Sequence, residues 1–293
     1  MDLYETDSTT GAGLPLHLRL QDDWQIFPPH RDPEINKRFM MSMFPGGHEL
    51  LSAAKVTAIQ SENAEDHIHD WDLFARQLVD DNRFFPALQI KKDYLEQVVR
   101  DNVRTIAAGA SLFRARVGPS SSPLSPEVMG KPPAHLATPG RANSLGIPHF
   151  YAAFDRDTSI IESRALQHNY VSVAIFKTTK DIDCLNLASL KSENPFKIEQ
   201  GGIDRLASWK YLRRLGTELS KPIRGTDNKI DYVPTQYLCD FVKSLGITGI
   251  RYGSSLNPRG ENLVLFADEH IVIKPPVKAV EVTGATYQFT DLS

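Results

Sequence analysis

Five side chains in the middle of the chain are of the types that bind a nucleotide and break a glycosidic bond. Arg114 and Arg116 stand two residues apart in SLFRARV, Arg141 lies in PGRAN, and Tyr151 in HFYAAFD is followed eleven residues later by Glu162. Arginine can grip phosphate through paired donors, an aromatic ring can hold a flat heterocycle, and a carboxylate can stabilise a sugar cation. Together they could cleave the nicotinamide–ribose bond of NAD.

Each of these side chains also has a structural interpretation that spacing alone leaves open. Arg114 and Arg116 alternate as residues on one face of a strand do, and that face could simply be solvated. Arg141 could brace the long Pro/Gly loop in which it lies, which holds seven prolines and four glycines over residues 118–149. Tyr151 could be a core aromatic residue.

Glu162 has a structural alternative of its own. The run Ser159-Ile-Ile-Glu162 fits the S-x-x-E capping box, in which the glutamate reaches back to the first amide of a helix. A carboxylate at a helix start would also point in a fixed direction, so capping and catalysis are compatible.

Two adjacent serines, Ser254 and Ser255, lie between the strand-like run GITGIRY and a turn that contains Gly260. Their hydroxyls could cap loop amides or bind a ribose or phosphate. The sequence has no nucleophile elbow and no Ser/His/Asp order, which excludes a serine hydrolase.

Composition indicates a soluble globular protein with length for one large or two modest domains. The net charge of −3 argues against a protein that coats nucleic acid, and no apolar run approaches a membrane span. Cys184 and Cys239 lack metal spacing and are expected to be reduced core thiols, so we expect a cytoplasmic location. The N-terminus lacks the pattern of a secretory signal. His67, His69 and Asp70 in HIHD lack the spacing of a helical zinc site, so no metal is expected.

The pattern of apolar residues changes near residue 108 and predicts two domains, 1–107 and 108–293. In the first, helices are predicted over 48–60, 69–82 and 91–110. In the second, short strand-like runs lie at 111–117, 147–154, 170–177, 181–188, 246–252 and 261–267, with helices at 159–168, 203–219 and 234–246. The strands do not alternate regularly with helices, so we predict an α+β fold with a split, mainly antiparallel sheet and flanking helices.

Three segments of the second domain, in order, resemble the RES domain family. They are LFRARVG, the run from Met129 to Ser163 that contains PGRAN and HFYAAFD, and the run from Tyr232 to Phe266 that contains YGSS. The resemblance covers about residues 108–270. It implies a fold similar to that of ADP-ribosyltransferases. The family is known as the toxin half of toxin–antitoxin pairs, usually beside an Xre-type antitoxin, and characterised members consume NAD or transfer ADP-ribose.

The resemblance also implies roles for motif residues. Glu162 would stabilise the ribose cation, Arg114 and Arg141 would clamp the diphosphate, and Tyr151 would contact the nicotinamide end. The motif serine corresponds to Ser254 or Ser255, and the pattern does not separate the two. The expected catalytic residues are thus Glu162, Arg114 and Tyr151, and the expected NAD-binding residues are Arg114, Arg141, Tyr151, Ser254 and Ser255.

The function implied is an NAD-degrading toxin, a glycohydrolase or phosphorylase whose activity arrests growth. A protein ADP-ribosyltransferase and a non-catalytic nucleotide-sensing module are the alternatives. An Xre-type antitoxin and a second copy of the chain are the candidate protein partners. The chain departs from the family pattern at Phe113, where tyrosine is common, and at residues 191–230, which look like an insertion. The helical N-terminus resembles an extra domain that some longer members carry.

Overall fold

A computed structural model describes most of the chain. The described residues are 3–6, 13–28, 30–44, 46–53, 55–58, 71–87, 91–190, 194–198, 201–222 and 228–284. The HIHD motif lies outside these ranges. Within them, no helix combines the length and the apolar character needed to cross a membrane.

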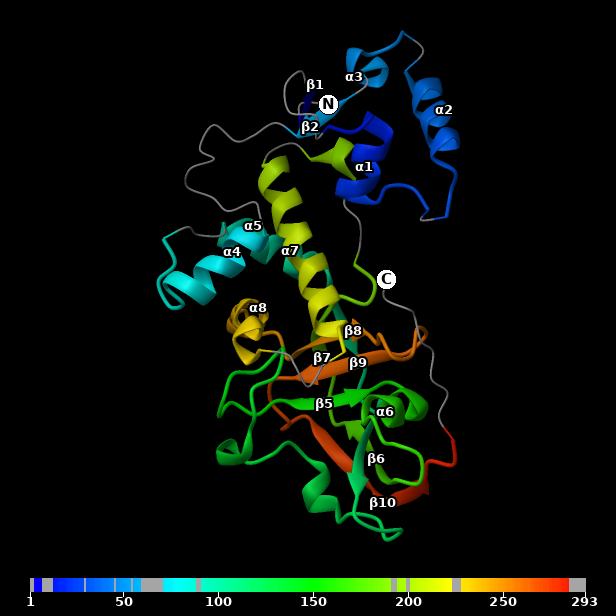
Figure 1. Ribbon diagram of the computed structural model, residues 1–293, viewed down its shortest axis with the longest axis vertical. Helices are drawn as coiled ribbons and strands as arrows, with labels where there is room; N and C mark the ends of the chain where they lie inside the picture. Colours follow the sequence, from blue (N-terminus) through cyan, green and yellow to red (C-terminus); the bar gives the residue numbers. More distant parts are fainter. Residues whose placement is uncertain are drawn as a thin grey trace, which may run out of the picture.

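An eight-stranded sheet forms the centre of the second half of the protein (Figure 1). All neighbouring strands are antiparallel except β7 and β8, which are parallel. The expected α+β fold with a mainly antiparallel sheet is therefore confirmed. In spatial order the strands are β10 (Ile271–Glu281), β6 (Tyr170–Thr178), β4 (Ser111–Gly118), β5 (Phe150–Ala153), β9 (Glu261–Leu265), β8 (Gly249–Gly253), β7 (Ile182–Asn186) and β3 (Val103–Ile106).

The sheet opens between β4 and β5. Strand β4 pairs with β6 along its whole length, but it pairs with β5 at one position only, Phe113 opposite Ala153. Beyond that position a side chain replaces the backbone pairing of the two strands: the Arg114 guanidinium donates a hydrogen bond to the Tyr151 carbonyl at 2.8 Å. The expected split in the sheet therefore lies between the strands that carry two of the candidate residues, Arg114 and Tyr151.

All six predicted strands are present, but sequence reasoning missed the two edge strands. Strand β10 contains Pro275 and Pro276, and its register with β6 shifts between Lys274 and Lys278. Proline lacks an amide hydrogen and is tolerated at an edge, where one side of the strand needs no partner. Strand β3 lies inside the predicted helix 91–110, which instead ends at Asp101.

Helices of the second half cover the sheet and carry parts of the site. They are α6 (Arg156–Glu162), α7 (Gly202–Ser220) and α8 (Val233–Ser244). As the sequence indicates, α8 has Pro234 in its first turn, and Gly246 follows its end with a left-handed φ of 78°. Short 3₁₀ helices lie at Pro126–Met129, Ala134–Leu136, Pro195–Lys197 and Lys229–Tyr232.

The N-terminal region is largely helical, with one small sheet. Its elements are β1 (Tyr4–Thr6), α1 (Leu16–Trp24), α2 (Pro33–Met43), α3 (Glu49–Ser52), β2 (Val56–Ala58), α4 (Trp71–Arg76), the π-helix Gln77–Asp81 and α5 (Lys92–Asp101). The predicted helix 48–60 is wrong beyond Ser52, because Val56–Ala58 pairs with β1 as a strand. The predicted boundary after residue 107 falls just behind β3, so the large sheet draws on residues from both sides of it.

The apolar core has three parts. One covers a face of the sheet and joins α4, α5, α7 and α8 to β7, β8 and β9, with Leu212 and Leu238 among its members. A second lies around Leu112 and Phe150, and a third, around Trp24, packs residues of the first part of the chain against Leu206 of α7. Helix α7 therefore runs from the α1–α3 region to the sheet (Figure 1).

Both cysteines are free and buried, in agreement with the sequence analysis. Burial raises the pKa of the Cys184 thiol to about 12 and that of Cys239 further still. Protonated thiols in the core are poor nucleophiles, so neither residue is a candidate for chemistry.

Candidate functional site

A cleft of about 610 Å³ lies beside the opening between β4 and β5. It is lined by four of the six expected catalytic and NAD-binding residues, which come from four different parts of the chain: Arg114 from β4, Arg141 from the loop before β5, Tyr151 from β5 and Glu162 from α6. Residues separated by nearly fifty positions thus share one cavity. Ser254 and Ser255 are not part of the lining.

The Glu162 carboxylate is held by two hydrogen bonds to one of its oxygens. Oε1 accepts from the Ser254 hydroxyl at 2.6 Å and from the Asn262 amide at 2.7 Å. Among the residues that the structure describes, Oε2 has no hydrogen-bond partner, so it can face a ligand. A carboxylate fixed in this way needs little reorganisation when positive charge develops nearby.

The two serines differ sharply. The Ser254 hydroxyl accepts hydrogen bonds from the amides of Leu256 and Asn257, at 3.2 and 3.0 Å, and donates its proton to Glu162. Ser255 is exposed. The structure thus places Ser254 behind the acid as a positioning residue, and a direct contact of either serine with a nucleotide stays a prediction.

The capping-box interpretation of Glu162 is wrong. Helix α6 begins earlier than expected, because Asp155 is its N-cap and accepts from the Thr158 amide at 2.8 Å. Ser159 lies inside the helix and Glu162 is its last residue. The carboxylate takes its direction from the turn after β8 and from β9, not from the start of its own helix.

Arg114 is a partly buried cation in the middle of the sheet that faces the cleft, which does not fit the interpretation as a solvated strand face. Its guanidinium bonds the Tyr151 carbonyl and lies over the Phe150 ring at 5.0 Å, while Nε has no partner among the described residues. Burial, with the nearby charge of Arg116, lowers its pKa to about 9. It remains positive at neutral pH, and an anion in the cleft would relieve the cost of burying it.

Arg116 lines the same cleft, although it was not among the expected NAD-binding residues. It donates to the Gly130 carbonyl at 2.8 Å, and burial lowers its pKa as well. Two neighbouring arginines of β4 therefore contribute positive charge to the cavity.

Tyr151 is fixed through its hydroxyl, which donates to Asn143 Oδ1 at 2.7 Å. Burial raises the pKa of this phenol, so it stays protonated. A Cβ atom on Gly140 would lie 2.6 Å from Asn143 Oδ1 and 3.1 Å from the Tyr151 hydroxyl. The glycine of PGRAN therefore permits the close approach that joins loop and ring.

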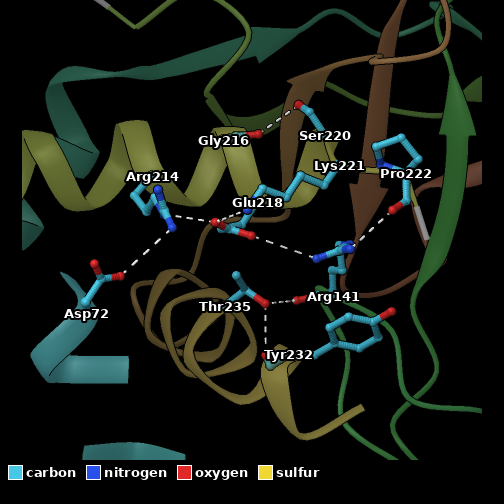
Figure 2. Close-up of polar contacts among 10 residues, drawn as sticks. All are labelled: Asp72, Arg141, Arg214, Gly216, Glu218, Ser220, Lys221, Pro222, Tyr232 and Thr235. Carbon is cyan, nitrogen blue, oxygen red and sulfur yellow. Dashed lines mark hydrogen bonds and ion pairs between the residues drawn. The ribbon is translucent and has the colours of Figure 1, made fainter. Parts of the chain in front are cut away.

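Arg141 braces the loop, as one interpretation expects, and it also lines the cleft, where its role in binding a ligand stays a prediction (Figure 2). Its guanidinium donates to the Pro222 carbonyl at 3.3 Å, lies 4.8 Å above the Tyr232 ring, and faces Glu218 of α7 at 3.9 Å. Its own carbonyl accepts from the Thr235 hydroxyl at 2.6 Å.

Several other lining residues were missed. Asn262 and Tyr252 come from paired positions of β9 and β8, and His149 precedes β5. Side chains alternate along a strand, so His149 lies on the same face as Tyr151. This alternation was the only sequence signal that could have placed His149 at the site. Lys221 and Lys229 come from the segment that looks like an insertion, where no motif pointed to a site.

Comparison with known families decides where the chain belongs. A family model described as RES domain matches residues 111–288, well over half of the chain. The chain is a member of the RES domain family. Among solved structures, a chain of the M. tuberculosis MbcT–MbcA toxin–antitoxin complex is similar to this RES protein, with 12% identity and a TM-score of 0.38. The match covers 65% of the present chain and 93% of the other. No curated protein matches the sequence.

Proposed function

We propose that the cleft of this RES protein binds NAD and cleaves its nicotinamide–ribose bond. One observation carries the proposal: Glu162, oriented by two hydrogen bonds, shares a single cavity with the cations Arg114 and Arg141. A dinucleotide offers the matching charges, because its diphosphate is negative and its ribosyl carbon becomes positive as the bond breaks.

The reaction needs few groups from the protein. The bond between C1′ of the ribose and the pyridinium nitrogen breaks, and its electron pair leaves with nicotinamide, which becomes neutral. Glu162 Oε2 lies free to stabilise the resulting ribosyl cation or its hydroxyls, an interaction stronger in the transition state than with bound substrate. Water then adds at C1′ and loses a proton, giving ADP-ribose. Inorganic phosphate adding at the same carbon would give the 1-phosphate instead.

The arginines would act by holding the substrate. Arg114 and Arg141, which both line the cavity, would pair with the diphosphate oxygens. The ribose would thereby be held beside Glu162. Tyr151 would contact the nicotinamide ring from β5. Binding energy from the phosphates would thereby be used to orient the reacting carbon.

Membership of the RES domain family supports a biological role for this reaction. We propose that the protein acts in the cytoplasm as a toxin, depleting NAD and arresting growth, and that an Xre-type antitoxin restrains it.

Purified full-length protein incubated with NAD tests the enzymatic proposal. Release of nicotinamide without any protein acceptor is expected, and Glu162→Gln should lower kcat by roughly 10²–10³, as loss of one transition-state stabiliser does. Glu127→Gln, an exposed glutamate in a 3₁₀ helix, is the matched control and should be without effect.

Two results would argue against this reaction. Turnover unaffected by Glu162→Gln would remove the acid from the mechanism. Nicotinamide release that depends on an added protein, with ADP-ribose transferred to it, would instead establish a protein ADP-ribosyltransferase.

A further inference from the structure

The C-terminal end of α7 lines the cleft although it lies outside every motif of the family pattern. Leu219, Ser220 and Lys221 contribute to the cavity lining, beside Arg141. They belong to residues 191–230, the segment that looks like an insertion. A site built only from the family motifs would lack this part of its surface.

One carboxylate organises the charged side chains at this end of α7 (Figure 2). Glu218 Oε1 accepts from Arg214 Nε at 2.8 Å and from Lys221 Nζ at 2.6 Å, and Oε2 lies 3.9 Å from Arg141. The Glu218 side chain is only 12% exposed. Three cations therefore gather around one largely buried anion. We call Arg141, Arg214, Glu218 and Lys221 the α7 cluster.

The charge of the α7 cluster is unevenly placed. Arg214 also faces Asp72 of α4, at 4.0 Å, on its other side (Figure 2). It does not line the cleft, whereas Arg141 and Lys221 do. Two of the three cations of the cluster therefore face the cavity, while the carboxylate that contacts them does not line it.

We propose that Glu218 holds Arg141 and Lys221 together at the cleft, so that α7 supplies part of the site that binds the diphosphate of the dinucleotide. The proposal rests on the proposed function and adds two residues to it. Lys221 is a binding residue, and Glu218 is a positioning residue that acts through its neighbours.

Elementary electrostatics explains why the carboxylate is needed. Like charges at close range repel, and the repulsion is stronger where water is partly excluded. Without Glu218, Arg141 and Lys221 would move apart and away from Arg214. A diphosphate has room for two cations on its oxygens, and cations already held side by side lose less freedom on binding it.

Binding of ADP-ribose to the full-length protein, measured by isothermal titration calorimetry, tests the proposal, with adenosine as the ligand that lacks phosphate. Lys221→Met should weaken ADP-ribose binding about fivefold, near the lower limit for a charged contact because this lysine is half-exposed. Glu218→Gln should weaken it by about the same factor, and adenosine binding should not change. Lys92→Met, which removes an exposed lysine of α5 away from the cleft, is the control.

A double-mutant comparison distinguishes positioning from a general loss of structure. In an Arg141→Ala background, Glu218→Gln should cost less than it does alone, since one of the side chains it positions is gone. Lys221→Arg should restore most of the affinity. The melting temperature of each variant shows whether it is folded. Because Lys221 is half-exposed, Lys221→Met should fold and still test the proposal even if Glu218→Gln does not fold.

The outcomes separate this inference from the proposed function. If Arg141→Ala weakens ADP-ribose binding while Lys221→Met and Glu218→Gln do not, the inference is overturned and the proposed function stands. Tighter binding by Glu218→Gln would show that the carboxylate competes with phosphate, which also overturns it. If Arg141→Ala itself has no effect on ADP-ribose binding, the diphosphate clamp of the proposed function fails.

Discussion

Two sets of residues meet at the cleft, and they are held in different ways. The motif cluster, which we define as Arg114, Tyr151 and Glu162, is fixed by hydrogen bonds of 2.6 to 2.8 Å to buried amides, hydroxyls and a strand carbonyl. The α7 cluster is joined by ion pairs between long side chains. Its members Lys221 and Arg214 are 46% and 44% exposed, whereas Arg141 and Glu218 are each 12% exposed.

The difference suggests that the two clusters have different roles. Side chains with a fixed direction in a partly dry site suit transition-state stabilisation, where a small displacement is costly. A half-exposed cation at the cleft, such as Lys221, suits the capture of an anion, which tolerates movement but is weakened by salt. The motif cluster should therefore govern kcat, and the α7 cluster should govern affinity. The following predictions test that contrast, from the largest effect to the smallest.

His149 shows how dry the motif side of the cleft is. It is 2% exposed, and burial, with the charges of Lys243 and Lys131, lowers its pKa from 6.5 to about 4. The unfolded chain therefore takes up a proton before the folded protein does. The free energy of unfolding should fall by about 3 kcal/mol as the pH drops from 6.5 to 4 because of this group alone.

Urea denaturation at pH 7 and pH 4 checks this value. His149→Leu should lose that part of the pH dependence, whereas His135→Leu, at an exposed position, should keep it. Equal pH dependence in all three proteins would show that the motif side is wetter than the structure indicates.

Ser254→Ala should lower kcat by roughly 30-fold, because a hydrogen bond to a charged group is lost and Glu162 is no longer held. KM should change little, since Ser254 does not line the cleft. Ser255→Ala is the matched control, one residue away and exposed. Steady-state kinetics with NAD separates the two, and a change confined to KM would mean that the serine binds substrate directly.

Arg141→Ala should raise KM for NAD about tenfold, the size expected when one charged contact to phosphate is removed. The melting temperature should change by only a few degrees, because the side chain belongs to a loop at the edge of the core. A protein that melts much earlier with unchanged KM would make Arg141 a brace and not a ligand.

Salt should produce the smallest effect. Raising sodium chloride from about 50 to about 500 mM should increase KM a few-fold through screening of the half-exposed cations, and kcat should stay nearly constant. Lys221→Met should reduce this dependence. A salt effect on kcat of equal size would contradict the proposed division between the clusters.

The sequence predicted most of the fold, and it singled out the three residues of the motif cluster that the structure brings to one cleft. Short runs of β-branched and aromatic residues between turn residues identified six strands, because those strands lie inside the sheet, where apolar content is highest. Strand β10 was missed since Pro275 and Pro276 normally argue against a strand, and only its place at the edge makes them harmless. The capping box at Glu162 was misleading because Asp155, four residues before Ser159, is the stronger cap.

The rest of the site depends on contacts distant in the chain. Nothing in YGSS distinguishes Ser254 from Ser255; the choice is made by a carboxylate 92 positions away. Similarly, Glu218 and Lys221 follow ordinary helical spacing, and only the packing of α7 against the sheet brings them to Arg141. Sequence patterns report local periodicity and cannot reveal contacts between residues that are distant in the chain.

The single paired position between β4 and β5 makes one side chain serve two purposes. Where β4 and β5 are no longer paired, the Arg114 side chain donates a hydrogen bond to the Tyr151 carbonyl in place of a backbone amide. The same guanidinium also lines the cavity. A ligand that attracts this guanidinium therefore pulls on the strand that carries the tyrosine ring. If the cleft binds a dinucleotide as we propose, phosphate binding by Arg114 and the position of the Tyr151 ring would be mechanically coupled through the gap in the sheet.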